Sequence, residues 1–218
     1  DAVMVVGEPS PAAGGGPGPG PGATTARLDA TNLLVAPGFV DLQCNGAVGV
    51  DLTTEPERLW EVAAALPRWG VTAWLPTVVT APPSVRRRAL AALRASPADG
   101  RPPSDPVAAT PLGLHLEGPF LAPERKGAHD IRYIVHPSAD VVDGEGWSRD
   151  AGVALVTLAP ELPRALEVVR SLVDRGVVVS AGHSSATADQ AAAAVEAGAT
   201  YVTHLFNAMA PLHHRAPG

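Results

Sequence analysis

Short apolar runs alternate with amphipathic segments along most of the sequence. The apolar runs cover residues 39–43, 71–75, 112–116, 153–158, 177–181 and 201–203. The segments with helical periodicity cover residues 55–69, 84–95, 162–174 and 186–197. Runs that are apolar throughout predict strands buried on both faces, and their alternation with helices predicts a parallel sheet built from βα units. We therefore expect an α/β domain over residues 37–218 with six strands in sequence order.

Two architectures accommodate this order of elements: a (β/α)8 barrel and an open, doubly wound sheet. Periodicity alone does not decide between them. A doubly wound sheet usually carries a glycine-rich nucleotide-binding turn after its first strand, and Asn-Gly-Ala-Val-Gly at residues 45–49 matches that pattern poorly. We therefore favour a TIM-type (β/α)8 barrel that is incomplete, with strands 1 to 6 present.

The first 36 residues differ in character from the rest. Residues 11–22 are almost wholly Pro, Gly and Ala, a composition that predicts a flexible loop. Short apolar stretches at residues 2–6 and 27–35 flank it and resemble strands. We expect residues 1–36 to be a partial β-sandwich that contains this loop.

The composition indicates a soluble protein and argues against several kinds of partner. A hydrophobic content of 46% fits a soluble core, and the 22 acidic residues outnumber the 16 basic ones without any basic run, so we expect no nucleic-acid partner. The single cysteine, Cys44, excludes an intramolecular disulfide. No apolar run reaches the length of a membrane span, and the start of the sequence lacks the pattern of a signal peptide. We expect a cytoplasmic protein without membrane contact.

Polar side chains follow the predicted strands at their carboxyl ends. Gln43 and Asn45 follow the first strand, Glu117 the third, His183 the fifth and His204 the sixth. In barrel enzymes this rim carries the chemistry. Two imidazoles and one carboxylate are a suitable ligand set for a divalent ion such as zinc, with a fourth position open for water.

Each of these positions also has a simpler interpretation. A histidine after a strand is more often a hydrogen-bonding group than a metal ligand. For Glu117 the simpler interpretations are an exposed loop acid and an ion pair with Arg125, but a buried carboxylate at the tight turn Gly118-Pro119 would need a cation opposite it. Gln43 and Asn45 suit hydrogen bonds to the rim backbone. Four other histidines fall in predicted loops, where solvent-exposed histidines are usual: His129, His136, His213 and His214.

Six sequence blocks sharpen this picture. They are APGFVDLQCNG at residues 36–46, GLHLEGPF at 113–120, KGAH at 126–129, LAPE at 158–161, SAGHS at 180–184 and THLFNAM at 203–209. In this order and spacing, the blocks resemble the N-acetylglucosamine-6-phosphate deacetylase family of the amidohydrolase superfamily. The resemblance covers residues 36–218.

The resemblance implies that Glu117, His183 and His204 bind a divalent metal ion, usually zinc. Many amidohydrolases hold a second metal with a His-x-His pair after the first strand. Gln43 and Asn45 occupy those positions here, and amides are poor zinc ligands, so we expect one metal.

The resemblance also implies the substrate contacts. Ala128 and His129 are expected at the substrate, with the His129 imidazole close to the acetamido carbonyl, where it stabilises the developing oxyanion. Asn207 and Ala208 match sugar-phosphate contacts, and Arg215 matches an arginine that binds the phosphate from a neighbouring subunit. We therefore expect an amino-sugar phosphate substrate and a homodimer of the full-length protein.

The implied reaction is metal-assisted hydrolysis of the N-acetyl group to give glucosamine 6-phosphate and acetate. In the family an Asp after the eighth strand transfers the proton, and the sequence stops after the sixth predicted strand. We therefore expect the chain to lack this catalytic acid/base and to be inactive by itself.

Two other functions remain open. One is a different amidohydrolase, such as a cyclic amidase or a dihydroorotase-like enzyme, although the only lysine, Lys126, does not lie on the fourth strand, where a bridging lysine would be expected. The other is an inactive remnant that binds a metal or a sugar phosphate.

Overall fold

The structure, a computed structural model, describes residues 32, 34–95 and 108–217. The predicted partial β-sandwich at residues 1–36, with its loop at residues 11–22, falls outside this part of the chain except for residues 32 and 34–36. The predicted barrel domain can be followed from β1 onward.

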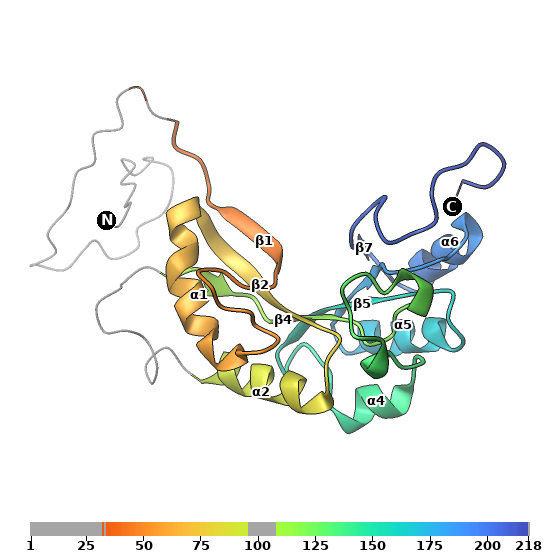
Figure 1. Cartoon of the computed structure of the whole chain (residues 1–218), viewed down its shortest axis with the longest axis horizontal. Helices are drawn as coiled ribbons and strands as arrows, with labels where there is room; N and C mark the ends of the chain where they lie inside the picture. Colours follow the sequence, from red (N-terminus) through yellow and green to blue (C-terminus); the bar gives the residue numbers. More distant parts are fainter. Residues whose placement is uncertain (1–31, 33, 96–107, 218) are drawn as a thin grey trace, which may run out of the picture. The chain divides into compact units, whose positions relative to one another are not determined.

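A curled parallel sheet forms the centre of this domain (Figure 1). Its strands follow the order β1-β2-β4-β5-β6-β7, and every neighbouring pair along this path is parallel. The strands are β1 (Phe39–Cys44), β2 (Val71–Val79), β4 (Leu114–Glu117), β5 (Val153–Leu158), β6 (Val178–Ala181) and β7 (Tyr201–Val202). The six predicted strands are thus confirmed, and they form the incomplete (β/α) barrel expected from the apolar runs.

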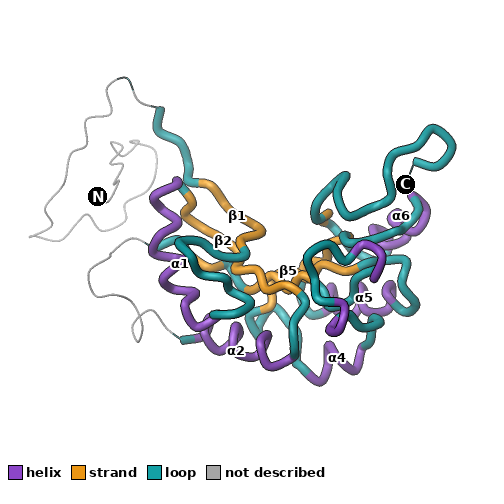
Figure 2. The backbone as a smooth tube through the Cα atoms, in the orientation of Figure 1, coloured by secondary structure: helices purple, strands orange, loops and turns teal. Residues whose placement is uncertain are grey.

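The helices lie along one face of the sheet (Figure 2). They are α1 (Leu59–Ala65), α2 (Pro83–Arg94), α4 (Ala139–Gly144), α5 (Ala165–Asp174) and α6 (Ala188–Glu196), with 3-10 turns η1 (Pro56–Arg58), η2 (Leu66–Trp69), η3 (Pro123–Arg125) and η4 (Ile131–Tyr133). The sequence predicted one continuous helix at residues 55–69. The structure divides this segment into η1, α1 and η2, and each 3-10 turn has a proline near its start, where a missing N–H is tolerated.

Three further features differ from the sequence prediction. Strand β3 (Thr110–Pro111) pairs with β2 and is too short to show a periodic pattern. Strand β4 begins at Leu114 because Gly113 has a φ of +121°, which interrupts the extended backbone. Helix α4 lies in a segment for which the sequence predicted no helix, and it begins after Ser138, whose hydroxyl accepts the N–H of Asp140 as a helix N-cap.

Apolar side chains on the helices pack against the sheet to form the core. Leu59 and Val62 of α1 and Val169 and Leu172 of α5 are fully or almost fully buried. Each such side chain contributes roughly 1.5–3 kcal/mol by leaving water. Their burial fixes the helices on the sheet and, through the connecting loops, the carboxyl ends of the strands.

A chain of buried hydrogen bonds crosses the interior of the sheet. His115 Nε2 lies 2.7 Å from Thr157 Oγ1, which lies 2.8 Å from Thr203 Oγ1, and Thr203 Oγ1 lies 2.7 Å from Ser180 Oγ. Burial lowers the pKa of His115 to about 4, so its imidazole is neutral at pH 7. The chain links β4, β5 and β6 to the residue that precedes His204, directly below the carboxyl rim.

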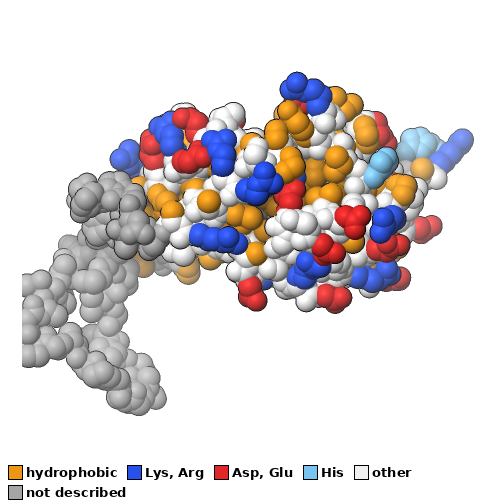
Figure 3. All heavy atoms as spheres, turned by 90° about the horizontal axis from the view of Figure 1, so that it is seen from below, with side chains coloured by type: hydrophobic (Ala, Val, Ile, Leu, Met, Phe, Trp, Pro, Cys, Tyr) orange, Lys and Arg blue, Asp and Glu red, His pale blue; other side chains and the backbone are white. Residues whose placement is uncertain are grey.

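The surface shows no field of a single charge sign over the described residues drawn in Figure 3, where acidic and basic side chains are mixed and apolar side chains lie between them. In the described ranges, none of the helices combines the length and apolar content needed to cross a membrane.

Candidate metal centre

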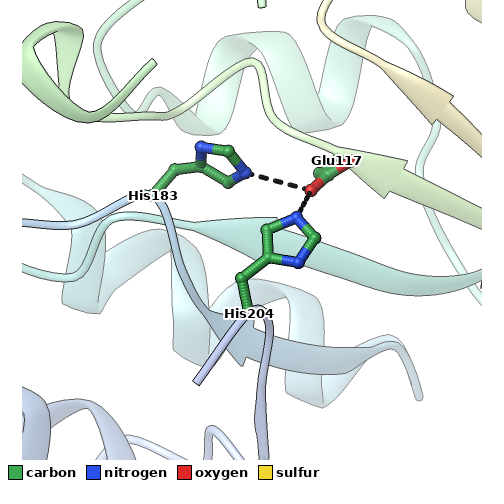
Figure 4. Close-up of side chains that lie close together, drawn as sticks. All are labelled: Glu117, His183 and His204. Atoms are coloured by element: carbon green, nitrogen blue, oxygen red, sulfur yellow. Dashed lines mark hydrogen bonds and ion pairs between the residues drawn. The ribbon is translucent and has the colours of Figure 1, made fainter. Parts of the chain in front are cut away.

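Three side chains from three strand ends converge at the carboxyl rim (Figure 4). Glu117 is the last residue of β4, and His183 and His204 each come two residues after β6 and β7. Nε2 of His183 lies 3.0 Å and Nε2 of His204 lies 2.7 Å from the same oxygen, Oε1 of Glu117. The three potential ligand atoms all lie within 4.8 Å of one another. The structure therefore brings together the three residues that the sequence singled out.

Two glycines allow the strand ends to approach this closely. Gly118 has a φ of +90°, and a Cβ at this position would lie 2.2 Å from Oγ1 of Thr80. A Cβ on Gly182 would lie 2.9 Å from both Thr157 Cγ2 and Thr203 Cβ. Any side chain at either position would push the neighbouring strand end away, so these glycines set the spacing of the rim beside Glu117 and His183.

Both histidines have a left-handed backbone conformation. The φ angle is +50° at His183 and +57° at His204. This conformation costs about 1–3 kcal/mol for a residue other than glycine and persists only where the surroundings impose it. Such strain is characteristic of functional sites, and here it turns both imidazoles toward Glu117.

The Glu117 carboxylate is buried without a lysine or arginine partner among the described ion pairs. Its side chain is 3% exposed. Burial raises the pKa of Glu117, but hydrogen bonds from His129, His183 and Gln43 outweigh burial and hold the pKa well below its usual value. The alternative ion pair with Arg125 is not formed, because Nε of Arg125 donates to Oγ of Ser185 instead. The carboxylate is thus ionised and faces only imidazole and amide groups.

The hydrogen bonds of His183 determine which of its ring nitrogens is free to bind a cation. Its Nδ1 lies 2.8 Å from the backbone carbonyl oxygen of Arg125, which only accepts hydrogen bonds, so Nδ1 carries the proton. The Nε2 lone pair of the neutral ring then faces Oε1 of Glu117, and two acceptors at 3.0 Å require a proton or a metal ion between them. Burial lowers the pKa of His183, but the hydrogen bonds to Glu117 and Arg125 prevail and raise it. A carbonyl that fixes Nδ1–H is also the usual outer partner of a zinc-binding histidine.

Proteins with a sequence similar to that of the chain are known. Proteins named N-acetylglucosamine-6-phosphate deacetylase from Danio rerio and Homo sapiens are each 42% identical to the chain over 198 residues, and each match covers 88% of the chain. The chain is a homologue of the N-acetylglucosamine-6-phosphate deacetylases. It spans about half the length of these relatives, 48% and 47% respectively.

The fold of this deacetylase homologue agrees with that of a solved relative. A mutant of the Mycobacterium smegmatis deacetylase, solved in complex with N-acetyl-D-glucosamine-6-phosphate, matches with a TM-score of 0.70 and 37% identity. The match covers 84% of the chain and 46% of that structure. No protein-family model matches the chain.

His129 of the deacetylase homologue lies beside Glu117. Its side chain is 3% exposed, so the simpler interpretation of a solvated loop histidine was wrong for this residue. Nδ1 of His129 accepts the backbone N–H of Thr80 at 3.1 Å, and Nε2 lies 3.8 Å from Oε2 of Glu117. Because Nδ1 accepts this bond, a ring proton lies on Nε2, on the side of the carboxylate.

Gln43 is also part of the rim in this homologue of the deacetylases. Its Nε2 lies 3.4 Å from Nε2 of His204, so its side chain reaches a proposed ligand. Asn45 is exposed, and its carbonyl oxygen accepts the N–H of Leu52. The residues at the His-x-His positions therefore differ in role, and neither supplies an imidazole.

The residues that the deacetylase resemblance implies as substrate contacts differ in their exposure and in their hydrogen-bond partners. Ala128 is exposed next to His129. The carbonyl oxygen of Ala208 accepts the N–H of Ser184 at 3.0 Å, which connects it to the turn after β6. Asn207 and Arg215 are exposed, and each forms a hydrogen bond within its own loop, Asn207 to Leu205 and Arg215 to His213.

Two residues close to the Glu117 cluster were missed from the sequence. Thr80 donates its hydroxyl to the carbonyl oxygen of Glu117 at 3.2 Å and contacts His129 through its backbone N–H. Glu161 accepts hydrogen bonds from Ser184 and Ser185. The LAPE block contained the only signal for Glu161, whereas an isolated threonine gives none.

Proposed function

We propose that the chain carries the metal centre of an N-acetylglucosamine-6-phosphate deacetylase. Glu117, His183 and His204 would hold one divalent ion, and zinc is the ion we propose because it suits two imidazoles and a carboxylate. The observation that carries the proposal is the approach of both Nε2 atoms to one carboxylate oxygen in a chain 42% identical to such deacetylases. Bound there, the ion would activate water for attack on the acetyl carbonyl.

His129 is proposed to polarise that carbonyl. Because the N–H of Thr80 occupies Nδ1, the proton on Nε2 is available to a substrate oxygen. A fixed donor of this kind stabilises the negative charge that develops on the carbonyl oxygen. The burial of His129 excludes competing water and strengthens the interaction.

Proton transfer to the leaving amine needs a second group, and the described cluster offers none. Glu117 is its only carboxylate, and a metal ligand with a strongly lowered pKa is a poor proton donor. We propose that the described residues bind the metal and the substrate and that the 218-residue chain does not release acetate by itself. Measured acetate release well above the rate of a Glu117→Ala variant would contradict this.

The proposed substrate is N-acetylglucosamine 6-phosphate, the ligand named for the solved mycobacterial relative. Ala128, Asn207 and Ala208 are the proposed sugar contacts. Arg215 is exposed and is proposed to bind phosphate, to which its planar guanidinium is suited. Homodimerisation and a cytoplasmic location remain predictions.

Isothermal titration of the zinc-loaded chain with N-acetylglucosamine 6-phosphate tests the proposal. We expect saturable binding that a chelator abolishes and that dihydroorotate, a cyclic amide, does not reproduce. Binding of the cyclic amide instead would favour the other amidohydrolase function. Binding of the sugar phosphate that is unaffected by the chelator would favour a remnant without a metal site.

A further inference from the structure

The carboxylate of Glu161 holds the turn that carries His183. Glu161 lies three residues after β5, and both of its oxygens are occupied by the turn after β6. Oγ of Ser184 donates to Oε2 at 2.6 Å, and the backbone N–H of Ser185 donates to Oε1 at 2.5 Å. A partly buried carboxylate thus binds the two residues that directly follow His183.

The same turn is held by further hydrogen bonds. Oγ of Ser184 accepts the N–H of Ala186 at 2.9 Å, and the N–H of Ser184 donates to the carbonyl oxygen of Ala208 at 3.0 Å. On the other side, Arg125 donates from Nε to Oγ of Ser185 and accepts Nδ1–H of His183. Two of these partners are charged side chains, the Glu161 carboxylate as acceptor and the Arg125 guanidinium as donor, and Glu161 alone binds both Ser184 and Ser185.

His183 needs such support. Its φ of +50° is unfavourable for a residue with a side chain, and relaxation of the turn would move the imidazole away from Glu117. Ser184 and Ser185 cannot follow a relaxing backbone while both donate to one carboxylate. The contacts of Glu161 therefore oppose the motion that would remove a metal ligand.

We propose that Glu161 is a positioning residue for His183 and thereby sets the metal affinity of the site without contacting the ion. This inference rests on the proposed metal site. The partners that orient metal ligands typically contribute about 10- to 100-fold to metal affinity. Glu161→Ala is accordingly expected to weaken zinc binding by about 10- to 100-fold.

Conservative and partner variants sharpen the test. Glu161→Gln keeps a carbonyl oxygen for the N–H of Ser185, so it should lose clearly less affinity than Glu161→Ala. Ser184→Ala removes the hydroxyl that donates to Oε2 of Glu161. The double variant Glu161→Ala with Ser184→Ala should lose less than the two single losses combined, because both remove the same interaction.

Glu167→Ala is the matched control. Glu167 lies on α5, has a 64% exposed side chain and pairs only with the exposed Arg164 among the described ion pairs. Its replacement removes the same charge from a nearby surface and should change zinc affinity less than about twofold, as expected for an exposed pair.

Zinc affinity is measured by competition with a chromophoric chelator on the full chain, beside the thermal unfolding of the metal-free protein. The proposal predicts a lowered affinity for Glu161→Ala while the metal-free melting temperature stays close to that of Glu167→Ala. If Glu161→Ala does not fold, Glu161→Gln and Ser184→Ala decide by the same measurement.

Two results would overturn the inference, and a third would affect the proposed function itself. Zinc affinity equal to that of the control overturns the positioning role if Glu117→Ala still abolishes binding. A loss of affinity that only parallels a loss of metal-free stability also overturns it, because it indicates a purely structural role. Zinc affinity unaffected by Glu117→Ala removes the metal site on which the inference rests.

Discussion

Oε1 of Glu117 lies 2.7 Å from Nε2 of His204, although 87 residues separate them in the sequence. The same oxygen also faces His183 at 3.0 Å, so one carboxylate oxygen joins the ends of three strands. The parallel order of β4, β5, β6 and β7 explains this, because the carboxyl ends of parallel strands meet at one rim. The predictions below separate the metal-binding role of this rim from its contribution to folding.

Replacement of His204 should affect metal binding more than stability. Its side chain is 38% exposed, so His204→Ala should change the free energy of unfolding of the metal-free chain by about 1 kcal/mol or less. Loss of a direct ligand should weaken zinc binding by more than about 100-fold, beyond the effect of an outer partner. Chelator competition measures this, with the exposed His214→Ala as the control. Equal zinc affinities for the two variants would contradict the assignment.

Replacement of His129 should weaken substrate binding and leave zinc binding almost unchanged. His129→Asn should leave zinc affinity within a few-fold of the original, because the ring is a proposed substrate contact and not a ligand. The affinity for N-acetylglucosamine 6-phosphate should fall about tenfold, the equivalent of one hydrogen bond. Calorimetry of the zinc-loaded chain checks this against His136→Asn, an exposed loop histidine. If zinc binding falls as in His204→Ala, His129 is a ligand.

The metal-free chain should lose stability as the pH falls from 6.5 to about 4 because of His115. Burial lowers the pKa of this imidazole from its ordinary value of 6.5 to about 4 in the folded state. Between these values the unfolded chain binds more protons, so acidification favours unfolding, by about 3 kcal/mol over the whole interval. Urea unfolding at several pH values measures the slope. His115→Gln should show a smaller slope, and an unchanged slope would contradict the prediction.

The buried hydrogen-bond chain below the rim should contribute to stability. Thr203→Val keeps the shape of the side chain but leaves Oγ of Ser180 without its partner at 2.7 Å. We expect a loss of about 1–3 kcal/mol in the free energy of unfolding, the cost of an unsatisfied buried polar group. Thr200→Val replaces an exposed threonine nearby and should change stability by no more than about 0.5 kcal/mol. Equal effects of the two substitutions would contradict the role of the chain.

The order of the elements could be predicted from the sequence because buried strands are continuous apolar runs. The run at residues 153–158 coincides with β5, and the run at 39–43 falls one residue short of the end of β1. Strand β3 could not be predicted, because its two residues are held by pairing with β2 and not by a pattern of their own. Helix α4 was missed because it is a single short segment inside a long connection.

Only part of the site could be predicted from the sequence in the same way. Strand ends indicated Glu117, His183 and His204, because the position of a residue after a parallel strand predicts its place on the rim. The burial of His129 could not be predicted from its position in a loop, since the contact with Thr80 depends on how that loop folds back. The contacts of Glu161 with the His183 turn likewise depend on the tertiary structure.

The number of metal ions bound per chain tests the central claim most directly. The chain is saturated with zinc, freed of excess ion and analysed by elemental mass spectrometry, beside Glu117→Ala and the exposed control Glu124→Ala. The account predicts one zinc ion per chain in the original and in Glu124→Ala, and none in Glu117→Ala. Two ions per chain, or one ion retained by Glu117→Ala, would contradict a single site built on Glu117, His183 and His204.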